Sequence, residues 1–341
     1  MNLTGTRYPL VQAPMAGVQG SALAAAVCQA GALGSLPAAL LSPAALDAEL
    51  RELGARHIGP ININFFCHRM APPDAAQEAA WRNALAPYYA EFGLDPNAVS
   101  AGPVRKPFDV EMAQVLQVHR PAIVSFHFGL PDEALLRQLK AWGAQVWSSA
   151  TTVEEALWLQ AHGADAVIAQ GLEAGGHRGS FLSTDDSRQL GTLALVPQVV
   201  RALRVPVIAA GGIADAAGVR AALALGAHAV QVGTAFLLCE EATTTAVHRA
   251  ALQSPQAAHT ALTRLFSGRP ARGIVNRLMR ELGPMNAAAP EFPWASSALQ
   301  PLRAHAEAQG LSDFTPLWCG QNASGCDAVK AAVMVQRLMA R

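Results

Sequence analysis

One phrase recurs along this chain: an Ala- and Leu-rich stretch, then a glycine, then a short apolar run. It reads AVCQAGALGS at 26–35, LKAWGAQVWSS at 139–149, LQAHGADAVIA at 159–169 and ALALGAHAVQV at 222–232. A glycine after a helical pattern is a common helix end, and the apolar run that follows has the length and composition of a buried strand. Repetition of such a unit predicts parallel strands that are joined by helical crossovers.

The whole chain contains eight candidate strands of this kind. Amphipathic helical patterns lie between several of them, at 21–30, 131–142, 152–162 and 216–225. Eight units favour closure into a TIM (β/α)₈ barrel over an open, doubly wound sheet. The predicted strands are residues 10–12, 32–36, 61–65, 122–126, 145–148, 166–169, 207–209 and 229–232.

Two segments do not fit the repeat. Residues 67–120 form a long insertion after the third strand, with a helical pattern at 74–92 and a Pro-rich remainder. Residues 240–341 form a C-terminal extension with helical stretches. Neither has enough apolar periodicity to predict a separate core. We therefore expect a single domain, 1–341, in which both segments act as lids on the barrel.

Composition excludes several classes of partner. The 341 residues are 51% apolar and carry 25 basic and 25 acidic side chains, so no basic excess favours nucleic acid or an anionic membrane surface. No apolar stretch reaches the roughly 18 residues of a membrane span, and residues 1–10 lack a signal pattern. A soluble, cytoplasmic protein is predicted. The five cysteines form no CxxC pair, so neither a metal site nor a disulfide framework is expected.

The sixth predicted strand leads into QGLEAGGHRG, residues 170–179. Active sites of TIM barrels lie at the C-terminal ends of the strands, and an imidazole there can transfer a proton near neutral pH. His177 is therefore the candidate catalytic residue. The alternative is a histidine that only hydrogen-bonds to its own loop.

The last two predicted strands also end in glycine. Gly211 and Gly212 follow one, while Gly233 and Thr234 follow the other. Free backbone N–H groups at two such neighbouring loops form the usual phosphate site of this fold, to which a threonine hydroxyl adds a donor. Tight packing of strand against helix is the alternative. Together with His177, these loops predict a phosphorylated cofactor with a histidine near its reactive end.

Other polar residues fall at strand ends as well. Asn64 and Gln170 are amides that could bond the edge of a flavin or nucleobase ring, although backbone groups could equally satisfy them. Ser125 and His127 share one face of the fourth strand, in SFHFG, and are candidate substrate contacts. For His127, a hydrogen bond within the core is an equally good interpretation.

Read in order, QAPMAG, NFFCH, SFHFG, QGLEAGGHRG, AAGGI, QVGTAF and the late WCGQ at 318–321 resemble the FMN-dependent nitronate monooxygenases, in particular their bacterial class I branch. The resemblance covers nearly the whole chain. It implies a TIM barrel that holds FMN at its strand ends, without a metal, and a histidine, here His177, that takes a proton from the substrate α-carbon. The residues that it places around FMN are Pro14, Met15, Asn64, Gln170, Gly175, Gly211, Gly212, Gln231, Val232, Gly233 and Thr234.

The activity that this resemblance implies is oxidation of alkyl nitronates or nitroalkanes, propionate 3-nitronate among them, by O₂ to a carbonyl compound and nitrite. The chain departs from the family at 291–294, where EFPW stands in place of a tyrosine-containing motif resembling DYPF. Two alternatives stay open. One is an FMN-dependent NAD(P)H reductase of quinones or enoyl thioesters, because the glycine motifs are shared with enoyl reductases. The other is a flavin-binding protein without turnover.

Overall fold

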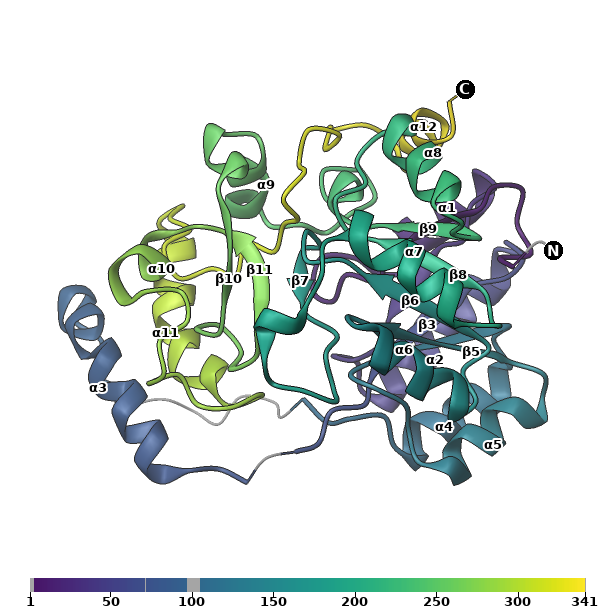
Figure 1. Ribbon diagram of the computed structural model, residues 1–341. Coiled ribbons are helices and arrows are strands. Elements are labelled where there is room, and N and C mark those ends of the chain that lie inside the picture. Colours follow the sequence, from purple (N-terminus) through teal and green to yellow (C-terminus); the bar gives the residue numbers. More distant parts are fainter. Residues whose placement is uncertain (1–2, 71, 97–104, 341) are drawn as a thin grey trace.

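Eight parallel strands form the centre of the protein in the computed structural model, which describes residues 3–70, 72–96 and 105–340 (Figure 1). Their order is β2-β3-β4-β5-β6-β8-β9-β1, and a parallel bridge between Val11 and Leu33 joins the two ends. The predicted TIM barrel is confirmed. The strands are β1 (Leu10–Gln12), β2 (Ser35–Pro37), β3 (Asn62–Phe66), β4 (Ile123–His127), β5 (Gln145–Ala150), β6 (Ala166–Gln170), β8 (Val207–Ala210) and β9 (Ala229–Val232).

The inside of the barrel is filled by apolar side chains that alternate with outward-facing ones. Val11, Ile123, Trp147, Ile168 and Ile208 are all buried and pack in one cluster. Their chain neighbours pack against the surrounding helices, as expected when successive residues of a strand point to opposite faces.

Helices surround this barrel. The four that the sequence predicted are present as α1 (Ser21–Gln29), α5 (Glu133–Ala141), α6 (Val153–Ala161) and α8 (Ala216–Ala224). Beside them lie α2 (Pro43–Ala55), α4 (Val110–His119) and α7 (Thr192–Ala202). Helix α4 was not predicted. It begins where the Asp109 carboxylate accepts the N–H of Met112 at 3.0 Å. Because the segment that contains it is rich in proline, no helix was expected there.

The last helix, α12 (Ala331–Leu338), lies between α1 and α8 and packs into the barrel core (Figure 1). It therefore holds the place of the helix that should follow the eighth strand. Within the expected C-terminal extension, the chain leaves the barrel after β9 and returns to it at α12.

A second group of elements lies against the mouth of the barrel, and we call it the cap. It contains α3 (Ala75–Phe92), α9 (Ala246–Leu252), α10 (Arg277–Leu282), α11 (Ala295–Ala308), β10 (Thr260–Thr263) and β11 (Ala271–Ile274). The described residues also contain three short 3₁₀ turns, at Asp186–Arg188, Thr234–Phe236 and Pro255–Ala258. The two strands of the cap were not predicted, because the extension was expected to be helical.

The insertion and the extension meet in the cap. Helix α3 packs on α11, where the Trp81 indole donates to the carbonyl of Ala295 at 3.0 Å and the Tyr89 hydroxyl donates to that of Ala298 at 2.6 Å. Their apolar side chains form a hydrophobic cluster of their own. Among the described residues, no helix is long and apolar enough to cross a membrane. The assignment of 1–341 to one domain stays a prediction.

Candidate active site

The C-terminal ends of the barrel strands surround a cavity of about 210 Å³, which we call the inner pocket. His177 and His127 line it, and so does every residue that the sequence analysis placed around a cofactor. These are Pro14, Met15, Asn64, Gln170, Gly175, Gly211, Gly212, Gln231, Val232, Gly233 and Thr234. Of the candidate residues, Ser125 alone is not in the lining.

Two loops of the inner pocket leave backbone N–H groups free. Those of Gly211, Gly212 and Gly233 make no hydrogen bond to any other part of the chain that the structure describes. The Thr192 hydroxyl donates to the carbonyl of Gly211 at 2.9 Å, and the amide of Asn322 donates to that of Gly212 at 3.2 Å. The carbonyl groups are thus bonded elsewhere. Gly211 and Gly212 have φ values of 117° and 72°, which glycine adopts without strain. Such N–H groups fit a phosphate.

Residues 318–322 complete this side of the pocket. The N–H of Gly320 donates to the Thr234 hydroxyl at 3.0 Å, and Trp318, Gly320 and Asn322 line the cavity. Gly175 fits here only without a side chain, because a Cβ atom would lie 2.5 Å from the backbone nitrogen of Gly320. The WCGQ motif is part of the family resemblance in the sequence, but no site residue was predicted in it.

The two predicted amides have different surroundings. Both ends of the Gln170 amide bond the backbone of the His177 loop: Nε2 donates to the His177 carbonyl at 2.9 Å, and Oε1 accepts the N–H of Gly179 at 2.8 Å. Gln170 therefore shapes the loop. Asn64 donates to Ser125 Oγ at 3.0 Å, and its Oδ1 has no hydrogen bond within the described residues. Ser125, fully buried, orients an amide that can still accept a proton donor from a ligand.

His177 is held by both the barrel and the cap. It lies on β7 (Gly176–His177), which pairs with β11 of the cap, and its Nε2 is 2.8 Å from Ser267 Oγ. Burial lowers the pKa of His177 well below its ordinary value, and the nearby charge of Arg105 lowers it further. The imidazole is thus neutral at neutral pH and can accept a proton. Ser267 was missed because it lies 90 residues away in sequence.

His127 supports the same loop. Its Nε2 lies 3.0 Å from the carbonyl oxygen of His177, which can only accept, so Nε2 carries the proton. Burial lowers the pKa of His127 to about 4. The hydrogen bond within the core that the sequence analysis considered is present, and the ring also lines the inner pocket.

Aromatic rings surround the His177 imidazole. The ring centroids of Trp318, Phe292, Phe128 and Phe66 lie 5.5, 5.6, 6.0 and 6.1 Å from it. Phe292 comes from the EFPW segment and brings no hydroxyl group to this wall. The site thus combines loops with unbonded N–H groups, a neutral imidazole and an apolar surround. Among the described residues, no group of three or more His, Cys, Asp or Glu side chains could hold a metal ion.

The nitronate monooxygenase family model matches residues 1–340 of this chain. The chain belongs to the nitronate monooxygenase family. A nitronate monooxygenase of Pseudomonas aeruginosa is 45% identical over 340 residues, which cover 99% of this chain and 97% of that protein. One from Paraburkholderia phytofirmans is 43% identical, with 98% and 92% covered. The family is one of oxidoreductases and is generally flavin-dependent.

Solved structures agree with this membership. A nitroalkane oxidase from Streptomyces ansochromogenes superimposes with a TM-score of 0.89 at 39% identity, covering 99% of this chain and 96% of that one. A mutant of FabK from Thermotoga maritima also matches, with a TM-score of 0.71 at 26% identity and coverage of 98% and 92%. The nitronate monooxygenase fold of this chain is therefore closer to the first structure than to the second.

Proposed function

We propose that this protein is an FMN-dependent nitronate monooxygenase that oxidises alkyl nitronates, propionate 3-nitronate among them, with O₂ to a carbonyl compound and nitrite. The observation that carries the proposal is the neutral, buried His177 beside a cavity with unbonded N–H groups at its far loops. Membership of the family supplies the class of reaction.

The residues present fit FMN. The N–H groups of Gly211, Gly212 and Gly233 would hold its phosphate, and Asn64 Oδ1 would accept a hydrogen bond from the ring system. Among the eight barrel strands, none is followed by an adenine-binding GxGxxG turn, so FMN is favoured over FAD. When bound, the flavin supplies electron transfer between the nitronate and O₂.

The chain itself orients the substrate and moves the proton. His177 would accept the α-proton of a neutral nitroalkane and, once protonated, would donate a hydrogen bond to an oxygen of the nitronate so formed. Ser267 holds the imidazole through Nε2, so the ring keeps one orientation. The four aromatic rings keep water away from the reacting carbon, which strengthens electrostatic contacts in the site.

Anaerobic mixing of the flavin-loaded protein with a nitronate or with NADH tests the proposal. We expect the nitronate to change the flavin absorbance spectrum at once and NADH to leave it unchanged. Rapid bleaching by NADH with no response to the nitronate would instead identify an NAD(P)H-dependent reductase. No response to either would favour a flavin-binding protein without turnover. Extraction and chromatography of the flavin test FMN, and recovery of FAD would contradict the phosphate site.

A further inference from the structure

Residues 319–328 run along the loops at one side of the inner pocket, and we call them the strap. The strap begins next to Trp318, which forms an antiparallel bridge with Gly273 of β11. It ends before Val329, which packs on the barrel core and whose carbonyl accepts the N–H of Glu240 at 3.1 Å. None of residues 319–328 lies in a helix or a strand. The strap is thus fixed to the cap at one end and to the barrel at the other.

Between these ends, hydrogen bonds tie the strap to the loops that follow β6, β8 and β9. They join the N–H of Gln321 to the carbonyl of Glu173 at 2.9 Å, the amide of Asn322 to the carbonyl of Gly212 at 3.2 Å, and the N–H of Gly320 to the Thr234 hydroxyl at 3.0 Å. Two of these loops carry the unbonded N–H groups of the inner pocket. The strap therefore lies against the same loops that would hold a phosphate.

The strap packs most closely on the barrel at Gly325. A Cβ atom on this glycine would lie 1.9 Å from the carbonyl oxygen of Ala214, in the loop after β8. A side chain at this position would therefore push the strap away from the loop, since non-bonded atoms cannot approach so closely. Gly325 is outside the lining that the described residues form around the inner pocket, so the change would not touch a ligand there.

Bonds within the strap give it a shape of its own. The N–H of Ser324 donates to Asn322 Oδ1 at 3.2 Å, and the N–H of Cys326 donates to the carbonyl of Ala323 at 3.0 Å. Ala323 and Cys326 add an apolar contact with the barrel side, whereas Gln321 and Ser324 are exposed. Segments with few buried apolar contacts open locally while the rest of a protein stays folded. The strap has these properties and can move as a unit.

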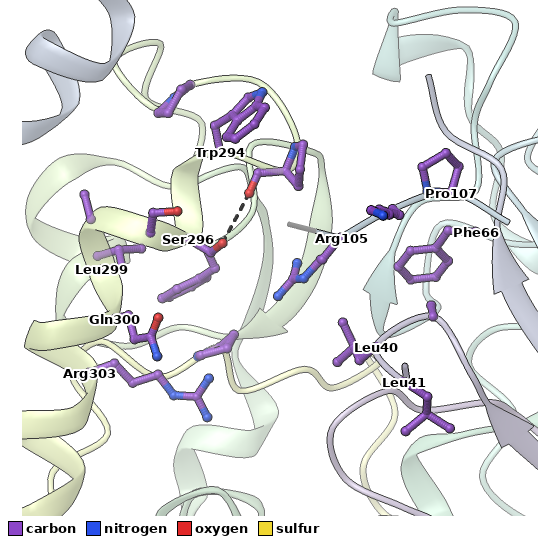
Figure 2. Close-up of a pocket in the computed structure, with 18 of the residues that line it drawn as sticks. Leu40, Leu41, Phe66, Arg105, Pro107, Trp294, Ser296, Leu299, Gln300 and Arg303 are labelled. Atoms are coloured by element: carbon purple, nitrogen blue, oxygen red, sulfur yellow. Dashed lines mark hydrogen bonds between the residues drawn. The ribbon is translucent and has the colours of Figure 1, made fainter. Parts of the chain in front are cut away.

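The inner pocket also meets a larger cavity of about 900 Å³ that lies between the barrel mouth and the cap (Figure 2). Leu40, Phe66 and Arg105 line both cavities. To reach the larger cavity from the glycine loops, a phosphate would have to pass the aromatic rings around His177, among them Phe66 and Trp318. Moving a charged group through apolar surroundings is costly. The route beneath the strap avoids these rings because it starts at the loops themselves.

We propose that the strap is a gate at the phosphate end of the inner pocket, which opens to let FMN enter or leave and closes behind the bound cofactor. Closure restores the hydrogen bonds of Gly320, Gln321 and Asn322 to the three loops and shields the phosphate from bulk water. Opening of the strap then limits the rates at which FMN binds and dissociates. The proposal rests on the proposed function for the identity of the ligand, and only for that.

The rates of FMN binding and release test the gate. Stopped-flow fluorescence measures the association of FMN with the flavin-free protein, and dilution of the loaded protein measures its release. Gly325→Ala should raise both rate constants about 5- to 150-fold and leave Kd within about 3-fold, because the collision with Ala214 destabilises the closed strap equally with and without flavin. Gln321→Ala is the matched control. Its side chain is exposed and its bond to Glu173 comes from the backbone, so both rates should match the wild type.

Two results of this experiment would overturn the proposal. If Gly325→Ala leaves both rates unchanged, FMN exchanges through the cavity beneath the cap and the strap is not its gate. If release becomes faster while association stays the same, the strap is only a contact of the bound cofactor.

Labelling of a thiol follows the strap without any flavin. Cys319 lies in the strap and is only 1% exposed, so a maleimide reaches it when the strap opens. In the flavin-free wild type, Cys319 should be labelled before the amides of β8 exchange with deuterium. Gly325→Ala should speed this labelling as much as it speeds FMN binding, without changing the labelling of Cys28 in α1. Labelling of Cys319 only on global unfolding would contradict the gate. If FMN does not bind, the proposed function fails, while this measurement still decides whether the strap opens.

Discussion

The burial of His248 predicts that the protein loses stability in mild acid. Its side chain is only 3% exposed, it bonds the backbone of Trp318, and burial lowers its pKa to about 4. In the unfolded chain a histidine has a pKa of about 6.5. Below that value the unfolded state binds a proton that the folded state does not bind. The free energy of unfolding therefore falls as the pH drops from about 6.5 to about 4.

The size of the effect follows from the two pKa values. Between about pH 7 and about pH 5, a single histidine of this kind removes about 2 kcal/mol from the free energy of unfolding. That is a sizeable part of the roughly 5–15 kcal/mol that holds a typical domain folded. His68 and His127 act in the same direction, because their pKa values are also lowered to about 4.

His248→Asn isolates one contribution. Asparagine keeps an N–H donor for the Trp318 backbone but does not titrate, so the variant should lose about 2 kcal/mol less than the wild type over this pH range. Urea denaturation of both proteins without flavin gives the two free energies. The exposed His259 is the control, and His259→Asn should match the wild type. An equal loss in wild type and His248→Asn would refute the reasoning, because His248 would then titrate alike in both states.

Substitutions at three positions probe the inner pocket, two of them with a matched control. Gly233→Asp should abolish retention of FMN in a folded chain because a carboxylate would repel the phosphate, whereas Gly233→Ala, whose Cβ meets only ordinary contacts, should purify yellow. Gly175→Ala should lower the free energy of unfolding by about 1–3 kcal/mol, measured in thermal or urea unfolding, because its Cβ would collide with the Gly320 backbone. The control is Gly54→Ala in α2, whose Cβ meets nothing within 4 Å and should not destabilise the protein. His177→Asn should keep FMN but slow oxidation of neutral nitroalkanes about 10²- to 10⁴-fold and nitronates much less; equal losses on both would assign His177 to binding.

The barrel could be predicted because its signal is local. Each helix, glycine and strand lies within one short stretch of sequence, and the glycine stops Gly31, Gly143, Gly163 and Gly226 all have positive φ. The strand-end candidates could be predicted for the same reason: once the strands are placed, their C-terminal ends must meet at one mouth. His177, Asn64 and the glycine loops needed no knowledge of distant contacts.

The helical pattern at 74–92 predicted α3, but the assembly of the cap could not be predicted because it depends on pairing between distant segments. Helix α3 is stabilised by α11, more than two hundred residues later, and the short strands β10 and β11 carry no clear alternation. Ser267 and Arg105 lie in such segments, so nothing in their local sequence indicates a site. Ser125 shows the reverse error: its strand position was right, but its side chain supports Asn64 from behind the pocket wall.

The pairing of β7 with β11 has a consequence for anyone who would exchange parts between related barrels. His177 is opposite Ala271 in this ladder, the N–H of Arg178 donates to the carbonyl of Pro270 at 2.8 Å, and Ser267 bonds the imidazole. His177 is thus held by the barrel and by the cap at once. A chimaera that takes the cap from one protein and the strand-six loop from another would break this ladder and misplace the imidazole, so the two segments must be transplanted as one unit.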